Sequence, residues 1–132
     1  MDYIYSMNTR LFINVLIADD AVEIRQRIAE AITELDSIAA VISKAKDGDE
    51  AYSLFESLRP DIAILDLQMP GLNGLDLIKA IRDKCSKIKI LVVTVFDGPD
   101  FKNRCLEAGA DAFLNKNAEF HLIPNTIQAI VN

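Results

Sequence analysis

The sequence is short of several features that mark particular classes of protein. No apolar run approaches the roughly 20 residues that a membrane-spanning helix needs, and the first ten residues lack the basic flank and apolar segment of a secretory signal. The two cysteines, Cys85 and Cys105, lack the CxxC spacing of a metal site, and a single histidine accompanies them. We therefore expect free, buried or half-buried thiols in a cytoplasmic protein that makes no contact with a membrane.

Basic residues are also too few for general binding to nucleic acid. The 132 residues carry a formal net charge of −6, so electrostatics oppose contact with a phosphate backbone. Hydrophobic residues, by contrast, make up 51% of the chain, which is enough for a sizeable core. The length is close to that of a single domain.

The most informative stretch is an apolar run that ends in a carboxylate, Asp66, before the turn at Pro70 and Gly71. Residues 62–65 have no polar face, which predicts a strand buried on both sides, as in a parallel sheet. Such a strand brings its last residue to the carboxyl edge of the sheet, where open α/β folds have their sites. Burial of an unpaired charge is costly, so Asp66 is a candidate site residue. Capping of the next turn is the alternative.

Apolar segments and amphipathic stripes alternate along the chain. Strands are expected at residues 11–18, 38–46, 62–65, 88–95 and 112–114. A helix follows each strand; Asp20 is placed to start the first, and Pro124 predicts a late or irregular start for the last. The alternation predicts an α/β fold with a doubly wound five-stranded parallel sheet of order 2-1-3-4-5. We read one domain, residues 11–132, after an N-terminal arm of residues 1–10.

Polar side chains stand at the ends of four predicted strands, and a parallel sheet brings these ends to one edge. They are Asp19, Asp20, Asp66, Thr94 and Lys116. Two unit charges about 4 Å apart interact by roughly 4 kcal/mol at an effective dielectric near 20, so three carboxylates would repel strongly. Lys116 cancels one charge, and a divalent ion would neutralise the other two. Ligation by oxygen alone favours Mg²⁺, or Mn²⁺, over Zn²⁺, which predicts a phosphoryl-transfer site.

This ordered set resembles the receiver domain of two-component response regulators. The resemblance covers about residues 11–131 and includes the run from Asp66 to Gly74. It implies a flavodoxin-like, receiver-like three-layer sandwich. It also implies that Asp66 is the nucleophile, which takes a phosphoryl group from a phosphohistidine on a sensor histidine kinase or a histidine phosphotransfer protein. Such a domain is a phosphoacceptor in a phosphorelay rather than an enzyme with a separate substrate.

The resemblance further implies a magnesium site around Asp66. Asp20 would bind Mg²⁺ directly, and Asp19 mainly through water. The backbone carbonyl of Gln68 would complete the protein ligands, together with Asp66 itself.

Three other residues take roles in binding and signalling by the same resemblance. Lys116 would pair with Asp66 and then with a phosphoryl oxygen, and Thr94 would donate its hydroxyl to the phosphoryl group. Phe113, at the family's switch-aromatic position, would change rotamer as Thr94 moves. The signal would reach the face built by the fourth helix, fifth strand and fifth helix, and from there a downstream protein target or a linked output domain.

The chain departs from the family in two places. Asn117 follows Lys116 where the family often has proline, so a trans peptide bond is expected. Phe96, two residues after Thr94, is a large apolar group that we expect at the mouth of the site together with Gln68. Four basic residues on the helices are expected to be solvated: Arg25, Arg27, Lys102 and Arg104.

Other functions fit the sequence less well. A haloacid-dehalogenase-type phosphatase needs an Asp-x-Asp pair, and Gln68 stands where the second acid would be. A flavodoxin-like cofactor binder needs a Ser/Thr-rich phosphate loop where Asp19 and Asp20 stand. A receiver-like protein-binding module that phosphorylation does not regulate is a third alternative, against which the intact acidic set argues. Whether the chain is a stand-alone receiver or a part of a longer regulator stays open.

Overall fold

The computed structural model describes residues 11–95 and 98–131. In chain order its elements are β1 (Leu11–Ala18), α2 (Val22–Thr33), β2 (Ile38–Ala45), α3 (Gly48–Leu58), β3 (Ile62–Leu65), α4 (Gly74–Lys84), β4 (Lys89–Thr94), α5 (Pro99–Ala108), β5 (Ala112–Asn115), the 3₁₀ turn η1 (Phe120–Leu122) and α6 (Ile123–Val131). Every predicted strand is present, with ends that differ by one residue at most. Within the described part of the chain, no helix is long and apolar enough to cross a membrane.

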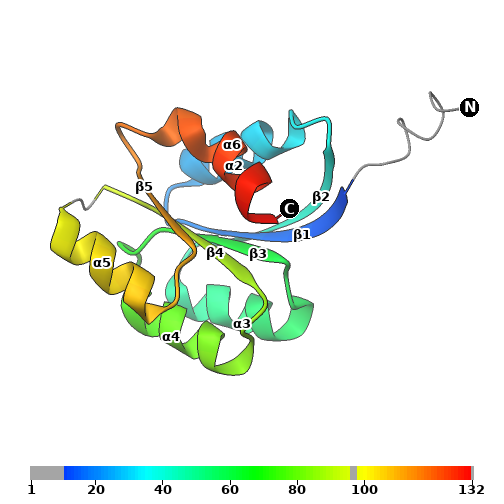
Figure 1. Ribbon diagram of the computed structural model, residues 1–132. Helices are drawn as coiled ribbons and strands as arrows, with labels where there is room; N and C mark the ends of the chain where they lie inside the picture. The colour runs from blue at the N-terminus through cyan, green and yellow to red at the C-terminus, as the bar shows by residue number, and fades with distance from the viewer. Residues whose placement is uncertain (1–10, 96–97, 132) are drawn as a thin grey trace, which may run out of the picture.

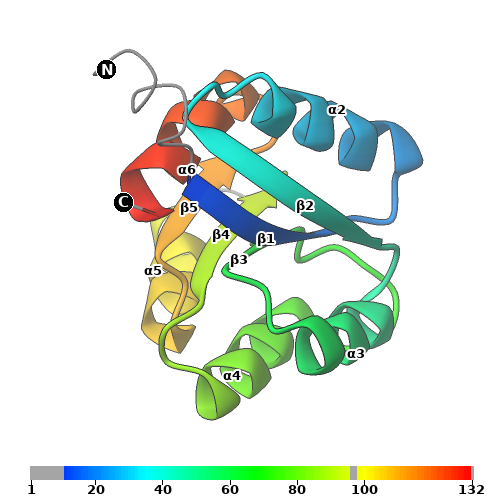
Figure 2. The ribbon, with the colours of Figure 1, turned by 90° about the vertical axis from the view of Figure 1, so that its right-hand side faces the viewer.

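The five strands form one parallel sheet in the order β2-β1-β3-β4-β5, as the sequence predicts. Helices α2 and α6 cover one face, and α3, α4 and α5 cover the other (Figure 1). Figure 2 shows β2 at the near edge of the sheet, with α2 on one side of it and α3 on the other. The molecule is therefore the three-layer sandwich expected.

Each face of the sheet has its own core. Phe55 and Ile81 are fully buried among the helices α3, α4 and α5, and Ile32 and Ile127 are fully buried between α2 and α6. Full burial of such a side chain contributes about 1.5–3 kcal/mol. All four residues of β3 are buried, because this strand is covered on both faces. This burial holds the carboxyl end of β3 in a fixed place.

The start of α2 differs from the prediction. Asp20 does not cap this helix: the N-cap residue is Ala21, and no side chain caps it. Instead, Oδ1 of Asp19 accepts a hydrogen bond from the amide of Ala21 at 2.9 Å. The carboxylate that stabilises this turn is thus the buried one, which leaves the side chain of Asp20 exposed.

The last helix begins irregularly, as Pro124 predicts. The 3₁₀ turn η1 comes first, and Pro124 is then the second residue of α6, where its missing amide costs no helical hydrogen bond. The described residues contain no cis peptide bond, so the bond between Lys116 and Asn117 is trans, as predicted.

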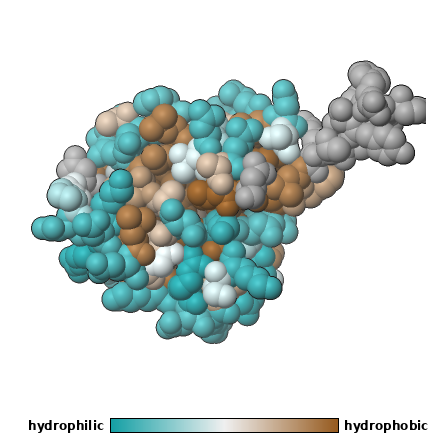
Figure 3. All heavy atoms as spheres, viewed as in Figure 1, coloured by the Kyte–Doolittle hydropathy of each residue, from teal (hydrophilic) through white to brown (hydrophobic). Residues whose placement is uncertain are grey.

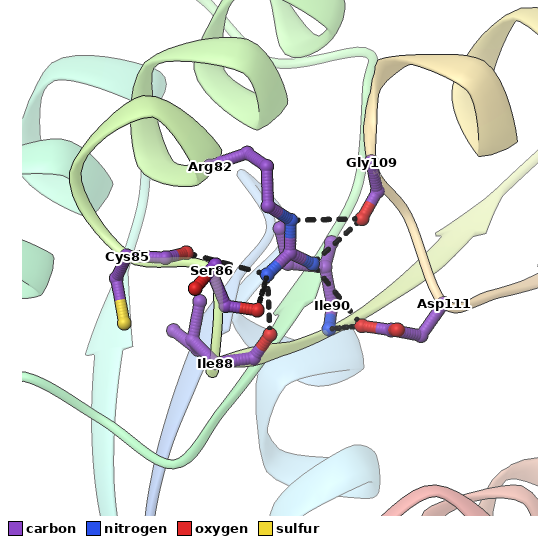
Figure 4. Close-up of polar contacts among 7 residues, drawn as sticks. All are labelled: Arg82, Cys85, Ser86, Ile88, Ile90, Gly109 and Asp111. Carbon is purple, nitrogen blue, oxygen red and sulfur yellow. Dashed lines mark hydrogen bonds and ion pairs between the residues drawn. The ribbon is translucent and has the colours of Figure 1, made fainter.

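At the amino edge of the sheet, the Arg82 side chain joins the loop after α4 to the loop after α5 (Figure 4). It donates hydrogen bonds to the backbone carbonyls of Cys85, Ser86, Ile88 and Gly109, and it forms an ion pair with Asp111. The Asp111 carboxylate also accepts from the amide of Ile90. One planar guanidinium therefore fixes two loops, which a single lysine amine could not do in the same way.

Candidate functional site

Three carboxylates meet at the carboxyl edge of the sheet. Asp19 and Asp20 follow β1, Asp66 follows β3, and an oxygen from each lies within 4.8 Å of the others. Asp19 is 1% exposed and Asp66 is 4% exposed, whereas Asp20 faces solvent. The predicted acidic cluster is therefore formed, with two buried members and one at its mouth.

Lys116 bridges the two buried carboxylates. Its Nζ lies 2.6 Å from Oδ2 of Asp19 and 2.7 Å from Oδ2 of Asp66. The loop after β5 positions this side chain, and the amide of Lys116 donates to the carbonyl of Thr94 at 2.8 Å. One ammonium group thus faces three carboxylates, which leaves the negative excess of two that the sequence predicts.

The electrostatics of the bridge follow from its burial. Burial raises the pKa of the Asp19 carboxyl above its usual value, against the opposing effects of Lys116 and of the amide of Ala21. Burial alone would lower the pKa of Lys116, but hydrogen bonds to Asp19 and Asp66 outweigh it and raise that pKa. Lys116 is therefore held in its charged form.

The hydroxyl of Thr94 has a different environment. Thr94 is the last residue of β4 and is fully buried, and its Oγ1 has no hydrogen-bond partner within the described structure. A buried polar atom without a partner costs about 1–3 kcal/mol, so such atoms call for a physical reason. A ligand oxygen that arrives at the acidic cluster would supply the missing partner.

The Asp66 carboxylate is oriented through both of its oxygens. Oδ2 accepts from Lys116, and Oδ1 accepts from the backbone amide of Gln68 at 3.0 Å. Gln68 is exposed, and its place at the mouth of the site stays a prediction. Phe96, which we predict at the same mouth, lies outside the described residues.

Phe113 is buried in β5, and its ring meets that of Phe101 on α5 edge to face, with 6.2 Å between the ring centroids. This contact connects the strand next to Thr94 with the neighbouring helix. A change in the rotamer of Phe113 would therefore alter its ring contact with Phe101 on α5.

Sequence reasoning missed two contacts on α2. Arg25 is not simply solvated: its Nη1 donates to the backbone carbonyl of Asp19 at 2.7 Å. The guanidinium of Arg27 lies 4.2 Å from the ring centroid of Phe120. The prediction of a solvated side chain was wrong for Arg25, which is half-buried, because the tertiary fold brings the Asp19 carbonyl near it. Arg27 is exposed, as predicted, and its ring contact with Phe120 adds to that. Lys102 and Arg104 are exposed, as predicted.

An oxygen-only donor set with two excess negative charges suits a hard divalent cation such as Mg²⁺. Neither cysteine takes part in the cluster: Cys105 is buried and Cys85 half-buried, and both thiols are free. The doubly wound α/β fold places this acidic cluster at the carboxyl edge of its sheet, which is where such folds bind their ligands.

The family model for the response regulator receiver domain matches residues 15–128. This chain belongs to that family. It is similar to the response regulator GacA of Pseudomonas viridiflava, with 32% identity over 106 residues that cover 80% of this chain and 49% of the relative. It is also similar to the nitrate/nitrite response regulator protein NarL of Escherichia coli K12, with 34% identity over 105 residues, 80% of this chain and 48% of the relative. The chain spans about half the length of these relatives.

Solved structures agree with the family. A two-component response regulator of the LuxR family from Aurantimonas sp. SI85-9A1 matches with a TM-score of 0.83 and 29% identity, over 92% of this chain and 86% of that one. The signal receiver domain of the putative response regulator NarL from Mycobacterium tuberculosis matches with a TM-score of 0.79 and 27% identity, over 90% and 95%. The resemblance drawn from the sequence is thereby confirmed.

Proposed function

We propose that this receiver accepts a phosphoryl group on Asp66 from a phosphohistidine donor, in a reaction that depends on Mg²⁺. The arrangement that supports this most directly is the bridge from Lys116 to the buried carboxylates of Asp19 and Asp66, beside the unpaired hydroxyl of Thr94. It offers a fixed nucleophile, a positive charge and a free donor within one site. The turn that Asp19 stabilises accounts for one of its oxygens, but it does not account for a second buried carboxylate at Asp66 or for the orphaned hydroxyl of Thr94.

In the proposed transfer, a carboxylate oxygen of Asp66 attacks phosphorus. The new bond is O–P, the bond that breaks is the P–N bond of the phosphohistidine, and its electron pair stays on the imidazole nitrogen. Lys116 and the amide of Gln68 orient the nucleophile before the reaction, which lowers the entropic cost of reaching the transition state.

The acidic cluster is the proposed metal site. Asp20, Asp66 and the backbone carbonyl of Gln68 would bind Mg²⁺, or Mn²⁺, directly, and Asp19 mainly through water. When bound, the ion supplies positive charge that offsets the charge on the phosphoryl oxygens.

After transfer, Lys116 and Thr94 bind the new group. Lys116 exchanges its contact with Asp66 for a phosphoryl oxygen, and the Thr94 hydroxyl donates to another. Thr94 of β4 pairs with Asn115 of β5, and the ring of Phe113 on β5 contacts Phe101 on α5. A movement of Thr94 therefore passes to the face built by α5, β5 and α6. Loss of the phosphoryl group by self-catalysed hydrolysis resets the domain.

A sensor histidine kinase or a histidine phosphotransfer protein in the cytoplasm is the proposed donor. The signal then passes either to a separate target protein or to a linked output domain, since relatives about twice as long carry the name response regulator. The proposal includes no direct contact of this domain with nucleic acid.

Replacement of the acceptor tests the proposal. Asp66→Asn should abolish uptake from acetyl phosphate or a phosphohistidine donor in Mg²⁺, measured as added mass on the intact protein. Asp83→Asn, which changes an exposed carboxylate on α4, should leave uptake unchanged. Undiminished uptake by the Asp66→Asn protein would sink the assignment, and no uptake by the unaltered protein would favour the unregulated binding module.

A further inference from the structure

The loop that carries Gln68, residues 66–73, packs against the first turn of α3 at Gly48. The amide of Gly48 donates to the carbonyl of Pro70 at 3.1 Å. A Cβ placed on Gly48 would lie 2.3 Å from the carbonyl oxygen of Leu72, far closer than real Cβ atoms come to a backbone atom. Only a residue without a side chain allows this approach.

The first turn of α3 is itself firmly held. Oδ1 of Asp47 caps the helix by accepting from the amide of Glu50 at 2.8 Å. Oε1 of Glu50 in turn accepts from the amide of Lys46 at 3.2 Å, one residue before the amide that the same side chain would reach in a capping box. Gly48 therefore presents a rigid surface to the loop rather than one that yields.

The loop has little freedom to move on that surface. Gly71 has φ of +86°, and a Cβ there would lie 2.6 Å from Oδ2 of Asp49. At the far end of the loop, a Cβ on Gly74 would lie 2.7 Å from Cα of Leu67. The backbone is thus in close contact at its middle and at both ends, with Gln68 between the contacts.

We propose that Gly48 is a positioning residue for the phosphoacceptor site, although no part of α3 belongs to that site. By fixing the height of the loop above α3, it sets where the backbone of Gln68 lies relative to Asp66. The hydrogen bond from the Gln68 amide to Oδ1 of Asp66 is the link that depends on this placement. This inference rests on the proposed function, because it assigns Gly48 an effect on the affinity for Mg²⁺.

The variant Gly48→Ala tests the contact directly. Alanine is the better helix former, so the substitution does not weaken α3 through its propensity, but its methyl group must push the Leu72 carbonyl away. Groups that orient metal ligands typically change affinity by about 10–100-fold when they are altered. We expect Mg²⁺ affinity to fall at least about tenfold, measured by calorimetric titration with MgCl₂ and no phosphoryl donor.

Phe55→Leu is the matched control, since it alters the buried side of the same helix away from the loop. It should lower stability and leave Mg²⁺ affinity as in the unaltered protein. An affinity of Gly48→Ala within about twofold of the unaltered protein overturns the proposal. So does an equal loss in Phe55→Leu, because the effect would then follow stability rather than loop position.

A measurement on the unaltered protein does not depend on the folding of any variant. Amide exchange at Gly48 should slow when Mg²⁺ and BeF₃⁻ are added, because a tighter loop protects the hydrogen bond to Pro70. Exchange at Gly48 that stays unchanged while the amide of Gln68 becomes protected overturns the proposal. Failure of the proposed function looks different: the unaltered protein would then bind no Mg²⁺ or take up no phosphoryl group.

Discussion

At the scale of single residues, Asp20 is the member of the acidic cluster with which Lys116 forms no ion pair. Asp19 and Asp66 are both paired with Lys116, whereas Asp20 is exposed and adds a third negative charge within 4.8 Å. Repulsion between Asp20 and the other two carboxylates destabilises the metal-free protein, and a bound divalent cation would remove this repulsion.

Asp20→Ala should therefore stabilise the protein without metal, by about 1 kcal/mol for an exposed charge of this kind. Addition of Mg²⁺ should raise the midpoint of thermal unfolding of the unaltered protein by mass action, and this rise should vanish in the variant. Thermal unfolding at several Mg²⁺ concentrations measures both effects. An undiminished rise in Asp20→Ala would remove this residue from the ligand set.

The two cysteine thiols differ in the direction of their pKa shifts and in their exposure to solvent. Backbone hydrogen bonds from Ile88 and Lys87 lower the pKa of the Cys85 thiol, whereas burial raises that of Cys105. Cys105 is also fully buried, and Cys85 only partly.

Iodoacetamide should accordingly modify Cys85 well before Cys105 in the native protein, because the thiolate is the reactive form. The rate at Cys85 should rise with pH through a midpoint below that of an ordinary cysteine. Peptide mass analysis at successive times measures this, with the urea-unfolded protein as the control in which the rates converge. Faster labelling of Cys105 would contradict the packing around α5.

Among the elements, α4 and α5 depend on the Arg82 contacts seen in Figure 4. Arg82 satisfies four backbone carbonyls at the amino edge of the sheet, with its side chain 22% exposed. Lys84, the last residue of α4, forms an ion pair with Glu56 of α3, and these side chains are 47% and 43% exposed. The first should matter to stability and the second little, because water screens exposed ion pairs.

Arg82→Ala should lower the free energy of unfolding by about 3 kcal/mol, since several carbonyls lose a charged donor at once. Lys84→Ala, two residues away, should change it little. Urea unfolding of both variants makes the comparison. Equal losses would show that the guanidinium adds no more than a surface pair does.

At the scale of the whole molecule, α5 is the α-helix with the fewest buried residues. Among its residues only Cys105 is buried, and glycines with positive φ stand at both of its ends, Gly98 at +106° and Gly109 at +123°. Figure 3 shows hydrophilic residues over α5 and hydrophobic ones gathered towards β5 and α6. A helix attached in this way can move without disrupting the core.

Binding of the phosphoryl mimic BeF₃⁻ with Mg²⁺ should therefore change amide exchange over residues 99–123 and leave the C-terminal half of α3 unchanged. The change would reflect new contacts of Thr94 passed through Phe113 to Phe101. Exchange that is the same with and without BeF₃⁻ over residues 99–123 would mean that the output surface lies elsewhere.

The sequence alone determined the architecture and the order of the polar residues along it. Apolar runs and their periodicity along the sequence predict the strands. A strand that is covered on both faces must be apolar throughout, as β3 is. The parallel sheet then requires residues such as Asp19, Asp66 and Lys116, which are far apart in the chain, to meet at one edge. The family could be inferred from this ordered set.

Only the tertiary structure decided which partner each of these side chains contacts. It showed that Asp19 rather than Asp20 stabilises the turn before α2, and that Arg25 reaches the carbonyl of Asp19. It also showed that Gly48 must be without a side chain, and that Arg82 joins two loops. Each of these facts depends on ångström-scale distances between segments that local propensity and periodicity do not specify, because those rules act over a few residues at a time.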